Sequence, residues 1–196
     1  MINREADSKK MMERLQVKNL YFNNTADFLL TNISGSRVLS VGCGSGDIEK
    51  IIKFNGSKEI MGLEISRSEN PKIPIQIYDG EEFPFENNSF DTVIFVYCLH
   101  HTQSLQEIRR LMEEAARVSK KEILILDHVY SNILERFGLI LFDYCWNKVF
   151  YLKLKMPITF NYLKEGEWRK LFDDMCLKVV EKENPFRSCI FFKLNN

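Results

Sequence analysis

The segment VLSVGCGSGD, residues 38–47, carries three glycines at two-residue spacing directly after an apolar run. Gly42, Gly44 and Gly46 are followed by IEKIIKF, a stretch typical of a helix. Glycines at the carboxyl end of a parallel strand let a ligand approach the backbone closely, because they have no side chain. A tight turn without a ligand is the alternative, so the glycines alone indicate only some nucleotide-like ligand.

Two acidic residues stand where the next two strand-like runs end. Glu64 closes IMGLE about twenty residues beyond the glycines, where a carboxylate can accept hydrogen bonds from both hydroxyls of a ribose. Asp79 follows the next run and can accept from the amino group of an adenine. An exposed surface position is the alternative for each. Because a dinucleotide fold would use the same acid, Glu64 indicates a ribose without deciding which cofactor carries it.

A third acidic residue, Asp47, distinguishes between cofactors. The dinucleotide fingerprint has a glycine three positions after Gly44, where this chain has Asp47. A carboxylate there repels a pyrophosphate but tolerates a cofactor whose sulfonium and ammonium groups are both cationic. The pattern therefore favours a sulfonium cofactor, and it disfavours the rival interpretation, a nicotinamide-dependent oxidoreductase.

Together these residues resemble the class I S-adenosylmethionine-dependent methyltransferases, in particular the small-molecule type that includes the ubiquinone and menaquinone biosynthesis enzymes. The resemblance covers residues 37–127, and its motifs include VGCGSG, FPFENNSFD and the LHH that ends at His101. It implies S-adenosylmethionine as the cofactor and methyl transfer to a small molecule. One departure is SKK at 119–121, where the family commonly has a proline and two glycines. The implied cofactor-binding residues are Gly42, Cys43, Gly44, Gly46, Glu64, Ile65, Asp79, Gly80 and the main chain of Phe95 or Val96.

The residues that could promote methyl transfer are histidines and aromatic residues. Transfer from a sulfonium is an in-line displacement, so an enzyme gains most by aligning acceptor and methyl group in a dry cavity. A hydroxyl or amine acceptor also benefits from a base, and we expect His101, just beyond the fourth predicted strand, to be catalytic ahead of His100. A structural role is the alternative. Tyr21 and Phe22 are expected to cover the cofactor, to line the acceptor cavity, or to pack in the core.

These side chains must be positioned by elements that the hydrophobic pattern predicts. Short β-rich runs alternate with helical stretches, which favours a doubly wound α/β fold with a mostly parallel, seven-stranded Rossmann-like sheet. An apolar stripe that begins at Leu105 predicts a helix over 105–118, with Ser104 as its N-cap. An Asn-Pro turn at 184–185 predicts an antiparallel C-terminal hairpin. The predicted strands span 37–41, 59–64, 73–78, 92–97, 122–127, 177–182 and 188–194.

The length of 196 residues and a hydrophobic share of 45% suit a single methyltransferase domain over 1–196. We expect leading helices over 1–35 and a cofactor-binding core over 37–127. The aromatic-rich segment 128–166 is too long for an ordinary connection and is expected to form a cap or an acceptor-side insertion. Core packing and a homodimer surface are the alternatives for its aromatic residues. A closing helix and the hairpin are expected over 167–196.

Charge and missing motifs limit the expected partners. Lysine plus arginine equals aspartate plus glutamate at 27 each, so no net positive charge attracts nucleic acid. No Asn-Pro-Pro-Tyr or Asp-Pro-Pro-Tyr run follows the fourth predicted strand, as resemblance to the adenine or glutamine amino methylases would require. We therefore expect a small-molecule acceptor, no DNA, and neither RNA nor protein as the acceptor. A non-catalytic module that keeps the fold as a scaffold or partner subunit is the alternative.

The cysteines and the apolar runs indicate a cellular setting. The five cysteines are widely spaced and form no C-x-x-C pair for zinc, so we expect reduced thiols, no metal and a cytoplasmic location. The longest apolar run, 137–142, is far shorter than the roughly 20 residues that cross a bilayer. We expect no membrane span.

Overall fold

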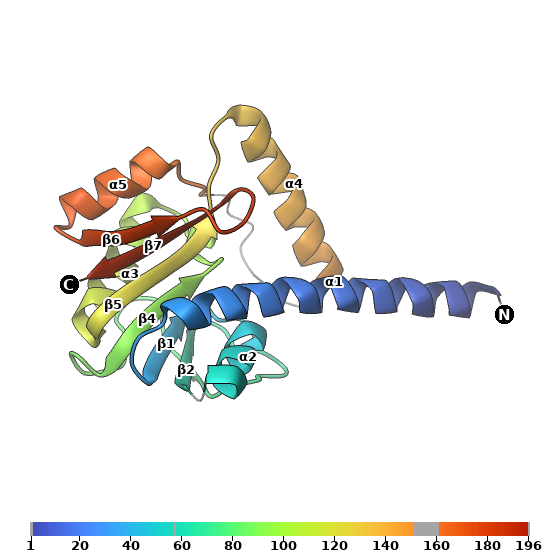
Figure 1. The fold of residues 1–196 in the computed structure, drawn as a ribbon, viewed down its shortest axis with the longest axis horizontal. Helices are drawn as coiled ribbons and strands as arrows, with labels where there is room; N and C mark the ends of the chain where they lie inside the picture. Colours follow the sequence, from blue (N-terminus) through green and yellow to red (C-terminus); the bar gives the residue numbers. More distant parts are fainter. Residues whose placement is uncertain (1, 57, 151–160, 196) are drawn as a thin grey trace.

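The structure is a computed structural model that describes residues 2–56, 58–150 and 161–195 (Figure 1). Strands alternate with helices along most of the chain, as the hydrophobic pattern predicts. In chain order the elements are α1 (Ile2–Asn32), β1 (Arg37–Val41), α2 (Asp47–Gly56), β2 (Glu59–Glu64), β3 (Ile75–Ile77), β4 (Phe90–Val96), the 3₁₀ helix η1 (Leu99–His101), α3 (Leu105–Val118), β5 (Ser119–His128), α4 (Ile133–Phe150), α5 (Glu165–Asp174), β6 (Lys178–Glu183) and β7 (Cys189–Asn195).

The described strands form one seven-stranded sheet in the order β3-β2-β1-β4-β5-β7-β6. The strands from β3 to β5 in this order pair in parallel, and β7 is antiparallel to both of its neighbours. The predicted fold class, including the antiparallel C-terminal hairpin, is confirmed. The strand order changes direction between β1 and β4, and the carboxyl ends of such strands border the crevice where open α/β sheets bind ligands.

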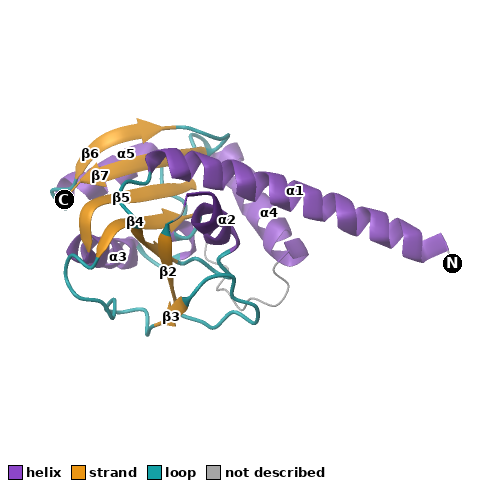
Figure 2. Cartoon of the chain, turned by 60° about the horizontal axis from the view of Figure 1, so that its bottom comes forward, coloured by secondary structure: helices purple, strands orange, loops and turns teal. Residues whose placement is uncertain are grey.

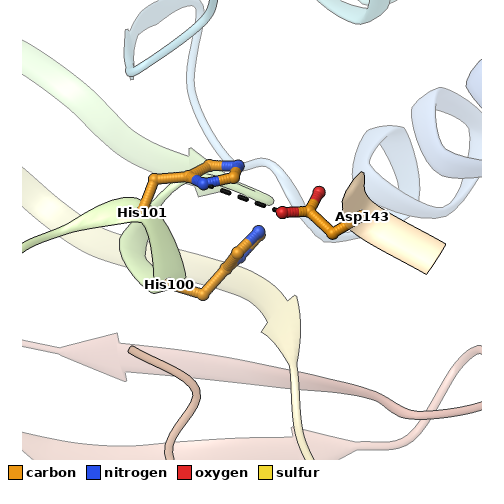
Figure 3. A group of neighbouring side chains, drawn as sticks. All are labelled: His100, His101 and Asp143. Carbon is orange, nitrogen blue, oxygen red and sulfur yellow. Dashed lines mark ion pairs between the residues drawn. The ribbon is translucent and has the colours of Figure 1, made fainter. Parts of the chain in front are cut away.

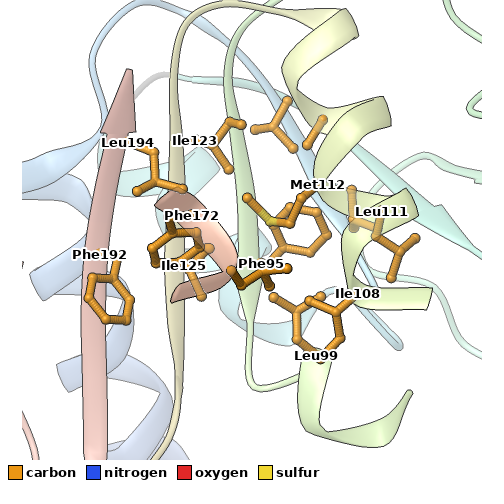
Figure 4. Close-up of a cluster of buried hydrophobic side chains, with 14 of the residues drawn as sticks. Phe95, Leu99, Ile108, Leu111, Met112, Ile123, Ile125, Phe172, Phe192 and Leu194 are labelled. Atoms are coloured by element: carbon orange, nitrogen blue, oxygen red, sulfur yellow. The ribbon is translucent and has the colours of Figure 1, made fainter. Parts of the chain in front are cut away.

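Helices cover both faces of the sheet, because successive side chains of a strand point to opposite faces. Phe95 of β4 packs on one face with Met112 of α3 and Phe172 of α5, as Figure 4 shows. Its neighbour Ile94 packs on the other face, with the buried Leu29 of α1. Each fully buried side chain of this size stabilises the fold by about 1.5–3 kcal/mol relative to an exposed one. The packed helices on both faces therefore fix the edge of the sheet from which the glycine loop extends.

Five of the seven predicted strands have different ends in the structure, and only the strands predicted at 37–41 and 59–64 have the same ends. β5 begins at Ser119, three residues earlier than predicted, and Ser119 pairs with Phe90 of β4. The residues SKK at 119–121, which replace the proline and glycines common in the family, therefore lengthen β5 at its start. β3 covers only Ile75–Ile77, because Pro74 before it has no N–H to donate to the ladder.

Helix α3 confirms one prediction about its start and contradicts another. The Ser104 side chain accepts a hydrogen bond from the Glu107 N–H, so Ser104 is the N-cap as predicted. Leu105 was expected in the apolar stripe but is 47% exposed. The buried side chains of α3 begin at Ile108, because the first turn of the helix makes the cap rather than the core.

The leading segment is one helix, α1, whose C-terminal part packs on the sheet through Ala26 and Leu29. Its N-terminal part extends beyond the sheet, as Figures 1 and 2 show from two directions. Helix α4 lies in the segment expected to form a cap, and Phe137 on it is 63% exposed. Tyr151 and the side chains of Trp146 and Phe150 lie outside the described residues, so the cap stays a prediction.

No helix in the part of the chain described here has both the length and the apolar character needed to cross a bilayer.

Candidate functional site

The glycine loop joins β1 to α2 at the carboxyl edge of the sheet. Gly42 and Gly44 have φ values of 69° and 60°, a region that favours glycine. A Cβ atom at Gly42 would lie 2.7 Å from the Cβ of Cys98, so a side chain does not fit there. At Gly44 an added Cβ would meet nothing within 4 Å. Gly44 therefore borders open space where a ligand can approach the backbone.

Glu64, at the end of β2, is held against this loop. Its Oε1 accepts a hydrogen bond from the Gly44 N–H at 2.5 Å, and its Oε2 accepts from the Ile65 N–H at 3.2 Å. The residue is 8% exposed, and burial raises the pKa of its carboxyl although the two backbone donors oppose that rise. Each oxygen keeps a second acceptor site, so the carboxylate can still receive hydroxyl donors.

Two cavities meet along the glycine loop. The Glu64 cavity lies over the ends of β1 and β2 and is lined by Val41, Gly42, Gly44, Leu63, Glu64, Ile65, Ser66, Tyr78, Gly80, Cys98, His101, Thr102, Glu107 and Leu111. The histidine cavity is lined by Tyr21, Phe22, Gly42, Cys43, Gly44, Ser45, Asp47, Ile48, Glu49, Val96, Tyr97, His100, His101, His128, Phe142 and Asp143. Gly42, Gly44 and His101 line both, so the two cavities adjoin at these residues.

The structure brings most of the expected cofactor residues to these two cavities. Of the remaining ones, Asp79 lines neither, and its Oδ1 accepts from the Glu81 N–H at 2.9 Å. The side chain of Phe95 is buried in the core. Gly46, with φ 78°, turns the chain into α2, and a Cβ there would collide with Ile73. The assignment of these residues to a cofactor stays a prediction.

The carboxylate of Asp47 has a cationic partner. Lys18 of α1 lies with its Nζ 3.2 Å from Asp47 Oδ2, and the Ser45 hydroxyl donates to the same oxygen at 2.8 Å. The charge that was expected to repel a pyrophosphate is therefore largely compensated. This contact joins residues 29 positions apart, which no local pattern reveals.

Glu49 of α2 is a buried acid that the sequence analysis missed. It is 2% exposed, and the Ser40 hydroxyl donates to its Oε1 at 2.7 Å. Burial raises the pKa of Glu49 to about 7. A signal was available, because Glu49 precedes the buried Ile52 by three residues and so lies on the inward face of the helix.

His100 of η1 is a buried residue paired with the carboxylate of Asp127. Its Nδ1 lies 2.5 Å from Asp127 Oδ1, and its backbone N–H donates to Asp127 Oδ2 at 3.2 Å. Burial lowers the pKa of His100, but the attraction and hydrogen bond from Asp127 outweigh it, so the pKa lies above its usual value. The ring of Tyr162 stacks on His100 at 5.0 Å between centroids. Asp127 thus fixes the orientation of the imidazole.

His101 lies beside His100 and faces an acid from a distant helix. The His101 Nδ1 is 3.9 Å from Oδ2 of Asp143 on α4, and the two histidine rings are 4.1 Å apart (Figure 3). Asp143 was not among the predicted site residues. An acid directly after the apolar run 137–142 was the available signal, because a charged residue in apolar surroundings usually has a polar partner.

Aromatic rings form the rest of the wall of the histidine cavity. Tyr21 stacks on Tyr97 at 5.4 Å, and Tyr97 stacks on His128 at 5.1 Å. Burial and the nearby His100 lower the pKa of His128 to about 4, so its ring is neutral at neutral pH. Tyr21 and Phe22 line this cavity, and Phe22 is also buried, so their role towards cofactor or acceptor stays a prediction.

The core of the chain matches a known family. Residues 39–126 match the family model described as "Methyltransferase domain", which covers β1 to β5 and the glycine loop, Glu64 and the two adjacent histidines. Residues 39–126 form an S-adenosylmethionine-dependent methyltransferase domain. The nicotinamide alternative is therefore wrong, and the predicted cofactor is confirmed.

Several curated relatives share this methyltransferase domain. A bovine (Bos taurus) protein, "Probable tRNA methyltransferase 9B", is 31% identical over 98 residues, which are 46% of this chain and 20% of the relative. The yeast (Saccharomyces cerevisiae) "tRNA (carboxymethyluridine(34)-5-O)-methyltransferase" is 29% identical over 61% of this chain and 38% of its own length. "Ajmaline N-methyltransferase" from Rauvolfia serpentina is 24% identical over 73% of this chain and 59% of its length. The chain spans less than two thirds of these relatives.

Solved structures share the fold of the methyltransferase domain. The PH0226 protein from Pyrococcus horikoshii has a TM-score of 0.68 at 17% identity and covers 91% of each chain. A complex of the Haloferax volcanii Trm112 methyltransferase activator with a methyltransferase gives a TM-score of 0.64 at 16% identity, over 93% of each chain. Geranyl diphosphate methyltransferase in complex with SAM gives 0.65 at 10% identity, over 88% of this chain and 84% of that one.

These comparisons correct the expectation about partners. The sequence analysis set RNA and protein aside, whereas two relatives are named as tRNA methyltransferases and one structural neighbour is solved with an activator protein. The net charge of the whole chain is zero. Net charge averages over the surface, so it does not exclude local contacts with RNA or with a second protein.

Proposed function

We propose that this protein transfers the methyl group of S-adenosylmethionine to a nucleophilic oxygen or nitrogen of a small molecule bound in the histidine cavity. The observation that carries the proposal is that the Glu64 cavity and the histidine cavity meet at Gly42, Gly44 and His101. One cavity can then hold the cofactor and the other the acceptor, with the methyl group between them.

The cofactor is proposed to lie along the glycine loop with its adenosine in the Glu64 cavity. The Glu64 oxygens would accept from the ribose hydroxyls, beside Ile65 and Gly80. Asp79 would accept from the adenine amino group through the oxygen that Glu81 leaves available. The methionine part would then lie over Gly42 towards the histidine cavity. The carboxyl groups of Asp47, Glu49 and Asp143 line that cavity and could accept hydrogen bonds from the ammonium group of a cationic tail.

Alignment of the acceptor with the methyl group is proposed to supply most of the rate enhancement. His101 is proposed to accept the proton that the acceptor loses. Holding the acceptor atom in line with the methyl and sulfur atoms removes the entropy cost of a bimolecular encounter. His101 lines both cavities, so its imidazole can take the proton that a hydroxyl or amine loses as it becomes methylated. Asp143, 3.9 Å away, would stabilise the imidazolium that forms.

The wall of the histidine cavity supports a small acceptor with a flat or apolar part. The rings of Tyr21, Tyr97 and Phe142 offer apolar surface, and the histidines supply polar contacts. The resemblance to the ubiquinone and menaquinone biosynthesis enzymes and the similarity to the ajmaline N-methyltransferase agree with such an acceptor. A second candidate acceptor is tRNA, favoured by the names of two relatives.

Methyl transfer from radiolabelled S-adenosylmethionine tests the proposal against this candidate. The protein is incubated with a low-molecular-mass extract in one arm and with total tRNA in the other. We expect label in a low-mass product, and clearly less label at a limiting cofactor concentration when Glu64→Ala replaces the wild type. Label that RNase releases from the tRNA arm would contradict the small-molecule proposal. Tight S-adenosylhomocysteine binding without transfer in either arm, with or without a candidate activator protein, would favour the non-catalytic scaffold.

A further inference from the structure

Three side chains at the acceptor end of the site converge on one point. His100 and His101 come from η1 and Asp143 comes from α4, and Figure 3 shows the three pointing toward one another. One ligand atom from each lies within 4.8 Å of the others. We propose that this cluster binds a divalent transition-metal ion of the zinc type, a site that the cysteine pattern did not predict.

Asp127 on β5 orients His100 so that one ring nitrogen is available as a metal ligand. Asp127 holds the Nδ1 of His100, which leaves Nε2 pointing away from that carboxylate. Nε2 is buried and has no hydrogen-bond partner among the described residues. Histidine ligands of metals characteristically donate their other ring N–H to a carboxylate in this way, which fixes the tautomer and the ring. A metal ion that replaces a proton on Nε2 would satisfy a buried polar atom and keep the bond to Asp127.

The donor set selects the class of metal. Two imidazoles and one carboxylate match three-ligand zinc sites, in which a fourth position stays open for water or substrate. Calcium and magnesium prefer sets made of oxygen atoms. Ligand bonds of about 2.0–2.1 Å in a tetrahedron require donor atoms roughly 3.4 Å apart. The His101–Asp143 separation of 3.9 Å is already close to that spacing.

The position of the cluster indicates that a bound metal would contact the methyl acceptor. All three side chains line the histidine cavity, so the open coordination position would face the proposed acceptor. An acceptor oxygen or nitrogen bound there would be oriented and made more acidic. In the metal-bound protein His101 would be a ligand and not a base. The metal would lower the pKa of the bound acceptor, which would then lose its proton to water. Metal binding itself does not depend on the proposed methyl transfer.

Cobalt titration of tag-free, chelator-treated protein tests the site without any activity measurement. We expect one Co²⁺ per chain, with the visible absorption of tetrahedral cobalt, and displacement of that signal by one equivalent of Zn²⁺. His101→Ala and Asp143→Asn should each weaken Co²⁺ binding at least tenfold. His128→Gln is the matched control, because His128 is the chain's third histidine, lies outside the cluster and should leave the affinity unchanged.

S-adenosylhomocysteine binding is measured on every variant, so that loss of folding is separated from loss of metal. The proposal is overturned if the wild type binds Co²⁺ no more tightly than Asp143→Asn, or if His128→Gln weakens binding as much as His101→Ala. Absence of S-adenosylhomocysteine binding in well-folded wild-type protein would contradict the proposed function and leave the cobalt result unaffected.

Discussion

Replacing Glu49 with glutamine removes a buried acid while keeping the shape of the side chain. Glu49 is 2% exposed and its Oε1 accepts from the Ser40 hydroxyl at 2.7 Å. In the Glu49→Gln variant the amide oxygen of the new side chain can accept the same hydrogen bond. The variant therefore differs from the wild type mainly in the proton that Glu49 binds and releases.

Burial sets the size and the sign of the expected effect. It raises the pKa of Glu49 from 4.5 to about 7, a difference that corresponds to about 3 kcal/mol. Because the folded-state pKa lies above the unfolded-state value, the folded protein holds this proton more tightly. The contribution to stability is fully present below about pH 4.5 and is lost as the pH rises through 7.

Urea unfolding of the cofactor-free protein at several pH values between about 4.5 and 8.5 measures this contribution. We expect the free energy of unfolding of the wild type, relative to Glu49→Gln, to fall by about 3 kcal/mol across that range. All other titrating groups are present in both proteins, so their contributions cancel in the difference.

An exposed acid on α3 supplies the control for this experiment. Glu113 is exposed, and Glu113→Gln should follow the wild-type pH dependence. Parallel pH profiles for the wild type and Glu49→Gln would refute the reasoning, because they would mean that Glu49 is ionised in the folded protein over the whole range.

Four further substitutions test the site. Glu64→Ala should weaken S-adenosylhomocysteine binding at least tenfold in calorimetry, since hydrogen bonds to a charged group contribute about 1.5–3 kcal/mol; an unchanged Kd would remove Glu64 from the site. Gly44→Val should abolish that binding, because its side chain fills the open space at φ 60°, and folded protein that still binds would refute this. His101→Ala should keep the affinity but lower kcat about 100-fold; an unchanged kcat would exclude it from catalysis. Asp127→Ala should lower the free energy of unfolding by about 3–5 kcal/mol, because it leaves His100 buried without its carboxylate, and a urea midpoint equal to that of the wild type would contradict the pairing.

The parts of the fold that could be predicted depend on short-range patterns. Strand and helix periodicity, the Ser104 cap and the glycines after β1 are each visible within about ten residues, and the structure has them close to their predicted positions. Glu64 was also predictable, because the ends of neighbouring parallel strands meet at one edge. Strand ends were less predictable, as Ser119 shows, because pairing with a distant strand decides them.

The parts of the site that were missed depend on contacts between distant segments. Asp143 meets His101 across 42 positions because α4 returns over the sheet edge, and Lys18 reaches Asp47 from α1. The apolar surroundings of Asp143 indicate a polar partner but not which one, and nothing near Lys18 indicates Asp47. Glu49 was missed for another reason, since a charged residue near a helix N-terminus is usually solvated, and that expectation outweighed its helical spacing to Ile52.

The insertion of β7 between β5 and β6 has a consequence for how the protein is made. β5 lacks a partner on one side until β7, some sixty residues later in the chain, has been synthesised. Until then its apolar run from Ile123 to Leu126 presents an open sheet edge, which is a template for pairing with other chains. Chains emerging from the ribosome should therefore be most prone to aggregation just before β7 appears, and a chaperone that shields this edge would raise the yield of folded protein.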